Sequence, residues 1–170
     1  MNDMKKYAGM DYETVLRKYA DYITRICVIN TGNREDAKDI FQNVFLKLYL
    51  TDKEFSNENY LKAWLIRVAI NECKDFHKTS WKRKVELGYK EISSEQICGQ
   101  KDIGYSSECQ ILIEALQNLS EKYRQIIYLY YCEEFSTREI ADMLRMSVNT
   151  VKSRLQRGRK KLAERWKIND

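Results

Sequence analysis

The chain has 170 residues, of which 44% are hydrophobic and 32% charged, and it carries a net charge of +5. This length allows one ordinary domain or two small ones, and the lack of proline with only six glycines favours helices over a turn-rich β architecture. Charged residues such as Lys5 and Asp11 interrupt the start of the chain, and no apolar run approaches the roughly 20 residues that cross a bilayer, so we expect a cytoplasmic protein without membrane insertion.

The N-terminal half has the periodicity of a helical module. Apolar side chains recur at three- and four-residue spacing in two stretches, which predicts two helices. Between them, Gly32 suits the end of the first helix and Asn33 can cap the second. A third helix is predicted over about 60–78, with Trp64 mainly in the core. We therefore expect a first domain at 1–81.

The helical periodicity stops after this domain. Gly88, Gly99 and Gly104 interrupt residues 82–107, which predicts a flexible linker. A second helical domain is predicted over 108–170. The predicted fold class is therefore all-α, with two small helical domains whose tether lets them hold two separate sites at once.

The segment 136–162 has the features of a helix-turn-helix. Ser136 and Glu139 form an S-x-x-E capping box at a helix start. A turn through Arg145 leads to Ser147, a good N-cap for a second helix. The apolar residues of both helices lie at helical spacing, and they are Ile140, Ala141, Leu144, Val151, Leu155 and Leu162.

The second helix of this motif is strongly basic. From position 145 to the end, the chain has nine Lys and Arg residues and only two acidic ones. Since the net charge of the whole chain is +5, the rest of it is slightly acidic. The predicted outer face consists of Asn149, Lys152, Ser153, Gln156, Arg157 and Lys160. These side chains can contact base edges and phosphates in a major groove. A plain solvated basic helix is the alternative, but the order of caps, small residue and turn favours DNA binding.

Another helix is predicted directly before the helix-turn-helix, from Ser120 to Cys132. Ser120 is expected to cap it, and its apolar residues are expected to pack on the helix pair. At its start, Lys122, Tyr123 and Arg124 lie where they could reach the DNA backbone.

Three stretches of the chain together resemble one family. Residues 119–162 resemble conserved region four of bacterial RNA polymerase sigma factors of the extracytoplasmic-function group, and residues 36–49 and 61–78 resemble region two. Their order and short separation are those of the two-domain form of the family. The resemblance implies a transcription initiation factor that binds core RNA polymerase, reads the −10 and −35 promoter elements and promotes DNA melting.

The resemblance implies three sets of contact residues. The polar face of the second helix would dock on the clamp helices of the polymerase β′ subunit through Asp36, Asp39, Gln42, Asn43 and Lys47. The −10 element would be contacted by Phe55, Asn57, Arg67, Asn71, Lys74, Asp75, Lys78, Lys82, Arg83 and Lys84. The −35 element would be contacted by Asn149, Thr150, Lys152, Ser153, Arg154, Gln156, Arg157, Arg159 and Lys160.

Individual roles follow from the same resemblance. Asn71 and Asp75 would lie near a flipped base of the −10 element, whose exposed Watson–Crick edge an amide or a carboxylate can read, and the loop 55–59 would close over it. In the −35 element, base contacts are implied for Lys152, Ser153, Gln156 and Arg157, and backbone contacts for Arg154, Arg159 and Lys160. The polymerase β flap and an anti-sigma factor are further implied partners.

The sequence departs from the family pattern at three positions. Arg145 and Asn149 stand where glycine is common, and Ser120 replaces a usual proline. Arg145 in a left-handed conformation would cost roughly 1 kcal/mol. None of these changes threatens the resemblance.

Two other readings remain open from the residues. One is a dimeric helix-turn-helix repressor or activator, and the other is a regulator of polymerase that has lost promoter recognition. An enzyme is not expected, because the sequence has no phosphate-cradling glycine loop, zinc motif or nucleophile elbow, and no cofactor or metal is implied.

The five cysteines are scattered and form no C-x-x-C pair. Cys27, Cys73 and Cys132 lie near apolar residues and are predicted in the core, while a redox role is left open for Cys98 and Cys109. The lone histidine, His77, is predicted at a surface or an interface.

Overall fold

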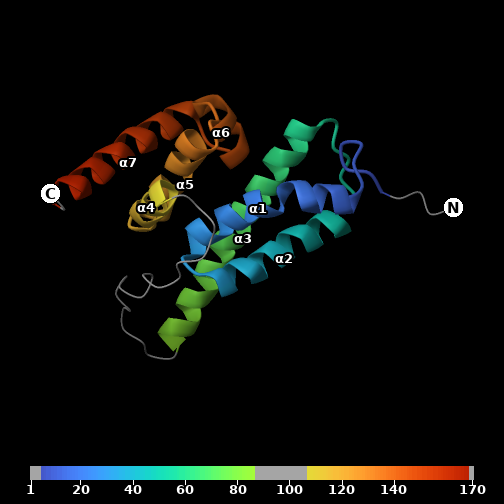
Figure 1. Cartoon of the computed structure of the whole chain (residues 1–170), viewed down its shortest axis with the longest axis horizontal. Helices are drawn as coiled ribbons and strands as arrows, with labels where there is room; N and C mark the ends of the chain where they lie inside the picture. Colours follow the sequence, from blue (N-terminus) through green and yellow to red (C-terminus); the bar gives the residue numbers. More distant parts are fainter. Residues whose placement is uncertain (1–4, 87–106, 169–170) are drawn as a thin grey trace. The chain divides into compact units, whose positions relative to one another are not determined.

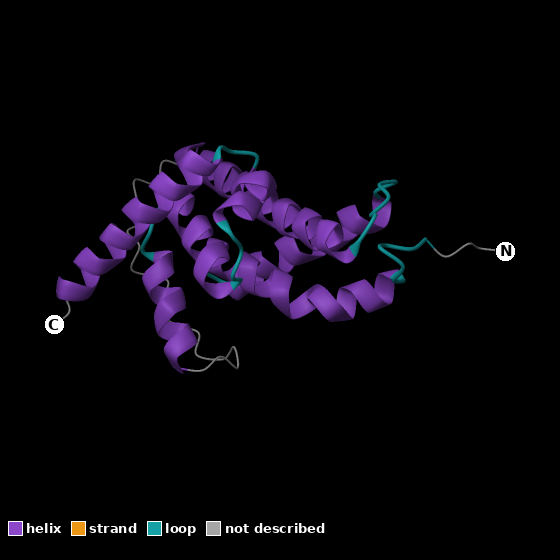
Figure 2. Ribbon diagram, turned by 90° about the horizontal axis from the view of Figure 1, so that it is seen from above, coloured by secondary structure: helices purple, strands orange, loops and turns teal. Residues whose placement is uncertain are grey.

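The computed structural model describes residues 5–86 and 107–168, which form two separate compact units of helices (Figure 1). The first unit contains α1 to α3 and the second contains α4 to α7. Helices account for nearly all of the described ranges, and no strand is drawn among them (Figure 2). The predicted all-α class with two helical domains is confirmed. The predicted linker lies mostly outside the described residues.

The first unit is a three-helix arrangement of α1 (Tyr12–Thr31), α2 (Arg34–Leu50) and α3 (Glu58–Glu86). Gly32 ends α1 in the left-handed conformation with φ 79°, and its N–H donates to the Val28 carbonyl at 2.9 Å. Asn33 caps α2, because its Oδ1 accepts from the Asp36 N–H at 2.8 Å. Both boundaries agree with the sequence prediction.

The core of the first unit is contributed by all three helices. Its largest fully buried side chains are Tyr7, Ile23, Ile26, Ile29, Leu48, Leu61, Leu65, Ile66 and Ile70. Cys27 and Cys73 are buried among them, as predicted. His77 joins α3 to α1, because its Nε2 lies 2.6 Å from the Asn30 carbonyl oxygen. The burial of each side chain of this size stabilises the fold by about 1.5–3 kcal/mol, so α3 is firmly held as far as His77.

The third helix is longer than the sequence predicted. Its predicted end was about Lys78, and the first domain was expected to end at 81, whereas α3 continues to Glu86. Among the described side chains after His77 none is buried, so packing within the unit does not hold these last turns. The stretch contains the good helix formers Lys82, Arg83, Lys84 and Glu86, and the first glycine comes only at position 88.

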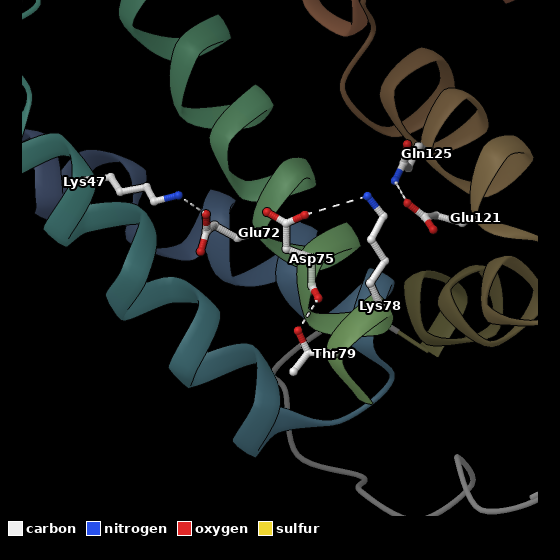
Figure 3. Close-up of polar contacts among 7 residues, drawn as sticks. All are labelled: Lys47, Glu72, Asp75, Lys78, Thr79, Glu121 and Gln125. Atoms are coloured by element: carbon white, nitrogen blue, oxygen red, sulfur yellow. Dashed lines mark hydrogen bonds and ion pairs between the residues drawn. The ribbon is translucent and has the colours of Figure 1, made fainter. Parts of the chain in front are cut away.

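The second unit consists of α4 (Ser107–Gln117), α5 (Glu121–Ile127), the π-helical turn η2 (Tyr128–Cys132), α6 (Thr137–Leu144) and α7 (Val148–Ile168). Helix α7 packs on α5 and α6. The buried apolar side chains are Leu116, Leu119, Tyr123, Ile126, Ile127, Tyr128, Leu129, Ile140, Ala141, Met143, Val151 and Leu155. The only buried polar side chain described there, Gln125, donates from Nε2 to Glu121 Oε1 at 2.9 Å (Figure 3).

Three expectations about the helix before the motif are wrong. Ser120 makes no side-chain cap hydrogen bond. Arg124 is half-buried and is not free to reach outward, because its guanidinium donates to the carbonyl of Leu116 near the end of α4 and to that of Leu119 just after it. Cys132 is exposed rather than buried, because the helix widens into the π-helical turn and shifts the facing of its last residues.

Candidate nucleic-acid interfaces

The helix-turn-helix is built from α6 and α7 by local capping. The Ser136 N–H donates to Glu139 Oε2 at 2.8 Å, and the Glu139 N–H donates back to Ser136 Oγ at 3.3 Å. Hydrogen bonds to the carboxylate from the Ser136 hydroxyl, at 2.7 Å, and from the Ser136 N–H hold the pKa of Glu139 below its ordinary value of 4.5, because they favour the charged form. Helix α6 ends at Arg145, which is left-handed with φ 53° and ψ 52°. The capping box predicted from sequence is confirmed. Arg145 adopts the left-handed conformation despite its expected cost of roughly 1 kcal/mol.

The start of α7 is fixed by a second cap. The Thr150 N–H donates to Ser147 Oγ at 3.0 Å, and the two hydroxyl oxygens lie 2.8 Å apart. Ser153 donates from Oγ to the Thr150 carbonyl at 3.0 Å. Thr150 and Ser153 are therefore partly engaged within the helix, so the other side chains of this face are better placed to meet a ligand.

The outward face of α7 is basic and exposed. Its exposed side chains are Asn149, Lys152, Gln156, Arg157 and Lys160, while Val151 and Leu155 are buried on the other side. Arg154 is half-buried, with Nη1 at 3.9 Å from Met146 Sδ. Arg159 lies over the rings of Tyr130 and Tyr131, at 5.9 and 5.7 Å from their centroids. The ring contacts favour one position of this guanidinium.

Gly158 allows α7 to approach α5 closely. A Cβ at this position would lie 2.7 Å from Ile127 Cδ1 and 3.4 Å from Tyr123 Cβ. Both neighbours are buried. The missing side chain therefore sets how close α7, and with it the basic face, lies to the core of the unit.

A second polar face runs along α3 in the first unit. Asn71, Asp75 and Lys78 are exposed, and Arg67 and Lys74 are half-buried on the same side. Asp75 and Lys78 form a surface ion pair at 4.0 Å, and the Thr79 hydroxyl donates to the Asp75 carbonyl at 3.0 Å (Figure 3).

The end of α3 carries the remaining predicted cations of the −10 set. Lys82 and Arg83 are exposed, and the side chain of Lys84 lies outside the described residues. Arg83 leaves the helix about 100° around from Lys82, away from Lys78, because the helix turns 3.6 residues per revolution. It does not share the face of Lys78 and Lys82.

The loop before α3 is held from two sides. Phe55 is 7% exposed, and its ring lies 5.5 Å from that of Trp64 and 6.2 Å from that of Tyr7. Its ring therefore supports the loop and does not face solvent, contrary to the direct DNA contact predicted for it. Asn57 is exposed, but its Oδ1 caps α3 by accepting from the Tyr60 N–H at 2.9 Å. Trp64 is half-buried.

Glu58 anchors the first turn of α3 to α1. Its Oε1 accepts from the Tyr19 hydroxyl at 2.7 Å and lies 2.5 Å from Lys18 Nζ. The hydrogen bond from Lys18 is the main reason that the pKa of Glu58 is lowered. Burial, followed by the bond to this carboxylate, raises the pKa of Tyr19. The contacts of Glu58 thus fix the position of the loop 55–59 next to the polar face of α3.

The polar face of α2 includes exposed apolar residues that the sequence analysis missed. Asp39, Gln42 and Asn43 are exposed, Asp36 is half-buried, and Lys47 pairs with Glu72 of α3 (Figure 3). On the same side, Leu46 is 53% exposed and Leu50 65% exposed. The run VFLKLYL made them look like core residues, but their four-residue spacing from Gln42 could have placed them on the polar face.

The described residues contain no group of three or more His, Cys, Asp or Glu side chains placed to hold a metal ion. Within the same ranges, no helix has the length and apolar character needed to cross a bilayer.

Two family models match the chain. The model described as "Sigma-70 region 2" matches residues 12–83, and "Sigma-70, region 4" matches residues 109–162. The two matched ranges span most of the chain and contain the polar faces of α2, α3 and α7. The chain belongs to the sigma-70 family, in its extracytoplasmic-function group.

Curated relatives agree with this assignment. The chain is 28% identical to "ECF RNA polymerase sigma factor SigW" of Bacillus subtilis, over 95% of this chain and 92% of that protein. It is 27% identical to "RNA polymerase sigma-E factor" of Streptomyces antibioticus, over 95% and 87% of the two chains. The "ECF RNA polymerase sigma-E factor" of Escherichia coli is 28% identical over 73% of this chain and 70% of its own length.

Solved structures share the fold of this sigma factor. The sigma factor RpoE in the co-crystal structure with the anti-sigma factor NepR from Bartonella quintana matches with a TM-score of 0.73, at 23% identity, over 94% of this chain and 98% of that chain. CnrH, solved in complex with the cytosolic domain of CnrY, matches with a TM-score of 0.66 over 94% and 89%.

Membership fixes the general function. The protein is a sigma factor for promoter recognition and transcription initiation by RNA polymerase, and its partners are core polymerase and promoter DNA. The family is non-catalytic, so the chemistry belongs to the polymerase.

Proposed function

We propose that this sigma factor reads its promoter with two separate faces. The outer face of α7 enters the major groove of the −35 element, where Lys152, Gln156 and Arg157 contact base edges. The α3 face holds the opened −10 element, where Asn71 and Asp75 read an extruded base. One observation carries the proposal. All five of these polar side chains are exposed, while the opposite sides of α3 and α7 are packed in the cores of their units.

The remaining predicted DNA residues have supporting roles in this proposal. Thr150 and Ser153 position the start of α7, Arg159 is held by its tyrosines to meet a phosphate, and Arg154 and Lys160 contact the backbone. Phe55 and Asn57 hold the loop beside the −10 face in place, through the ring contact of Phe55 with Trp64 and the Asn57 cap on α3.

The α2 face docks on the β′ clamp helices in the same proposal. Asp39, Gln42 and Asn43 surround exposed Leu46 and Leu50, an arrangement of an apolar centre with a polar rim that is typical of protein interfaces. Lys47 acts differently from the prediction, because its pairing with Glu72 joins α2 to α3. We assign it to holding the docking face in place.

Regulation by an anti-sigma factor is part of the proposal. Two proteins of the same fold have been solved with such a partner or with a cytosolic partner domain. The apolar centre of the α2 face gives such a partner a surface that it can cover to exclude polymerase. Because it works with RNA polymerase, this sigma factor is proposed to act in the cytoplasm. Its proposed second contact on the polymerase is the β flap.

Run-off transcription with core polymerase tests the proposal, using a randomised promoter library and the variants Asn71→Ala and Lys152→Ala. Loss of one base contact is expected to weaken the promoter by about 5- to 150-fold, from roughly 1–3 kcal/mol. Lys161→Ala is the matched control for Lys152→Ala, because it removes the same charge nine residues along α7, about 180° around the helix. If the two lysine variants weaken transcription equally, α7 contributes only nonspecific charge attraction and Lys152 does not contact a base. A protein that binds duplex DNA alone as a dimer, without polymerase, would favour the repressor alternative.

A further inference from the structure

The last turns of α3 leave the three-helix unit and carry an exposed tryptophan. Figure 1 shows the light-green end of α3 extending past the ends of α1 and α2. Trp81 lies on it and is 63% exposed. Isolated exposed apolar side chains are common and need no explanation. The position of this one on the helix gives it significance.

Trp81 continues the face of α3 that is proposed to hold the −10 element. At 3.6 residues per turn, its direction from the helix axis is about 20° from that of Lys74 and about 60° from that of Lys78. Lys82 lies about 40° beyond Lys78, on the same side of Trp81. The indole therefore lies beside a row of lysines and is the one exposed large apolar side chain described on that face.

The distance along the helix places Trp81 beyond the base proposed to be read by Asn71. Ten residues at 1.5 Å each separate the two by about 15 Å, which is about four base steps of a stacked strand at 3.4 Å each. A flat indole among cations is the arrangement by which proteins stack on unpaired bases while they neutralise the backbone. Paired and stacked bases offer no such face, so a partner for the indole exists only where the duplex is open.

We propose that Trp81 is a stacking residue that covers a base at the edge of the opened −10 segment, while Lys78 and Lys82 neutralise the adjoining phosphates. This adds an aromatic contact to the proposed −10 face, within one helical turn of Lys78, and rests on that proposed function. Trp81 thereby favours open over closed DNA, because it contacts a surface that melting creates. The contact tolerates any base, since every base has a π face.

The test uses holoenzyme assembled from the full chain and core polymerase, on a promoter selected from random DNA by the wild-type holoenzyme. Affinity is measured for the closed duplex and for a forked version in which the non-template strand of the −10 element is unpaired. Trp81→Ala is expected to weaken the forked probe about tenfold, equivalent to about 1.4 kcal/mol, and the duplex less than twofold. Trp81→Phe is expected to stay within about threefold of wild type on both probes.

Two controls separate stacking from charge and from folding. Arg83→Ala removes a cation from the same turn but about 160° around the helix from Trp81, so any loss is expected to be equal on both probes. Thermal melting of Trp81→Ala is expected to match that of wild type, because the side chain is exposed.

The outcomes divide clearly. Equal weakening of both probes by Trp81→Ala, no weakening at all, or weakened binding to core polymerase without DNA would each overturn the stacking role. Asn71→Ala is the reference for the proposed function. If Asn71→Ala weakens the forked probe and Trp81→Ala does not, only the stacking inference fails, whereas if neither does, the −10 assignment fails with it.

Discussion

A methyl group at position 158 tests how tightly the DNA-binding helix is seated. In Gly158→Ala the new Cβ would lie 2.7 Å from Ile127 Cδ1, against 3.4–4 Å for an ordinary contact. The clash is with the end of a buried isoleucine, so the side chain has little space into which it can turn. We therefore expect α7 to move away from α5 or Ile127 to adopt a poorer rotamer.

The expected magnitude follows from two opposing effects. Alanine is better than glycine inside a helix by about 1 kcal/mol. Overpacking a core by one methyl group costs about 1–3 kcal/mol. The net expectation is a loss of about 1 kcal/mol of unfolding free energy, with the loss confined to the second unit.

A double-mutant cycle isolates the clash. Ile127→Val removes the Cδ1 atom that meets the new methyl group and by itself costs about 0.5–1.5 kcal/mol. Combined with Gly158→Ala, it is expected to cost less than the sum of the two single changes, by about 0.5–2 kcal/mol. Hydrogen exchange of the α5 and α7 amides reads the stability of this unit separately from that of the first.

The result that would refute this reasoning is additivity. If Gly158→Ala stabilises the unit and the double mutant is the sum of the singles, the close approach of α7 to α5 is not what requires glycine. A second readout is affinity for duplex promoter DNA, which is expected to fall in Gly158→Ala and to recover in the double mutant.

Three further predictions concern stability. The folded-state pKa of Glu139 is depressed, so its bonds to Ser136 stabilise the fold fully above pH 4.5 and this stabilisation is lost as the pH falls through the folded-state pKa. The unfolding free energy measured against pH should show this loss in wild type and not in Glu139→Gln. Arg145→Gly is expected to raise the unfolding free energy by about 1 kcal/mol by removing left-handed strain, and an unchanged or lower value in urea denaturation would contradict it. Glu72→Ala is expected to lower stability by up to about 1 kcal/mol and to weaken core polymerase binding through the freed Lys47, whereas wild-type binding in a pull-down would argue against the positioning role.

The features predicted correctly from the sequence are those with local causes. Gly32, Asn33, Ser136 and Ser147 act on backbone groups within three or four residues, so their pattern in the chain is sufficient to place helix ends. The exposed outer face of α7 was predictable for the same reason, because the helical period separates it from Val151 and its neighbours.

The errors all have causes that are distant in sequence or that change the helical period. Phe55 is buried because Tyr7 and Trp64 reach it from elsewhere in the chain. Arg124 was expected near DNA, but carbonyls at the end of α4 accept its hydrogen bonds. Cys132 faces solvent because the π-helical turn breaks the spacing on which its core assignment depended. The length of α3 was underestimated because its end lacks the apolar periodicity used to recognise a helix.

The continuity of α3 makes the number of residues in it as important as their identity. Its 29 residues form one rod of about 44 Å, which is packed in the core up to Cys73 on one side and carries the polar face from Arg67 onward on the other. Inserting or deleting one residue after Cys73 would turn everything beyond it by about 100° relative to the core. Many surface substitutions can be accommodated there one at a time, but a change of length would misdirect the whole face, so evolution of promoter preference in this segment is restricted to exchanges of side chains.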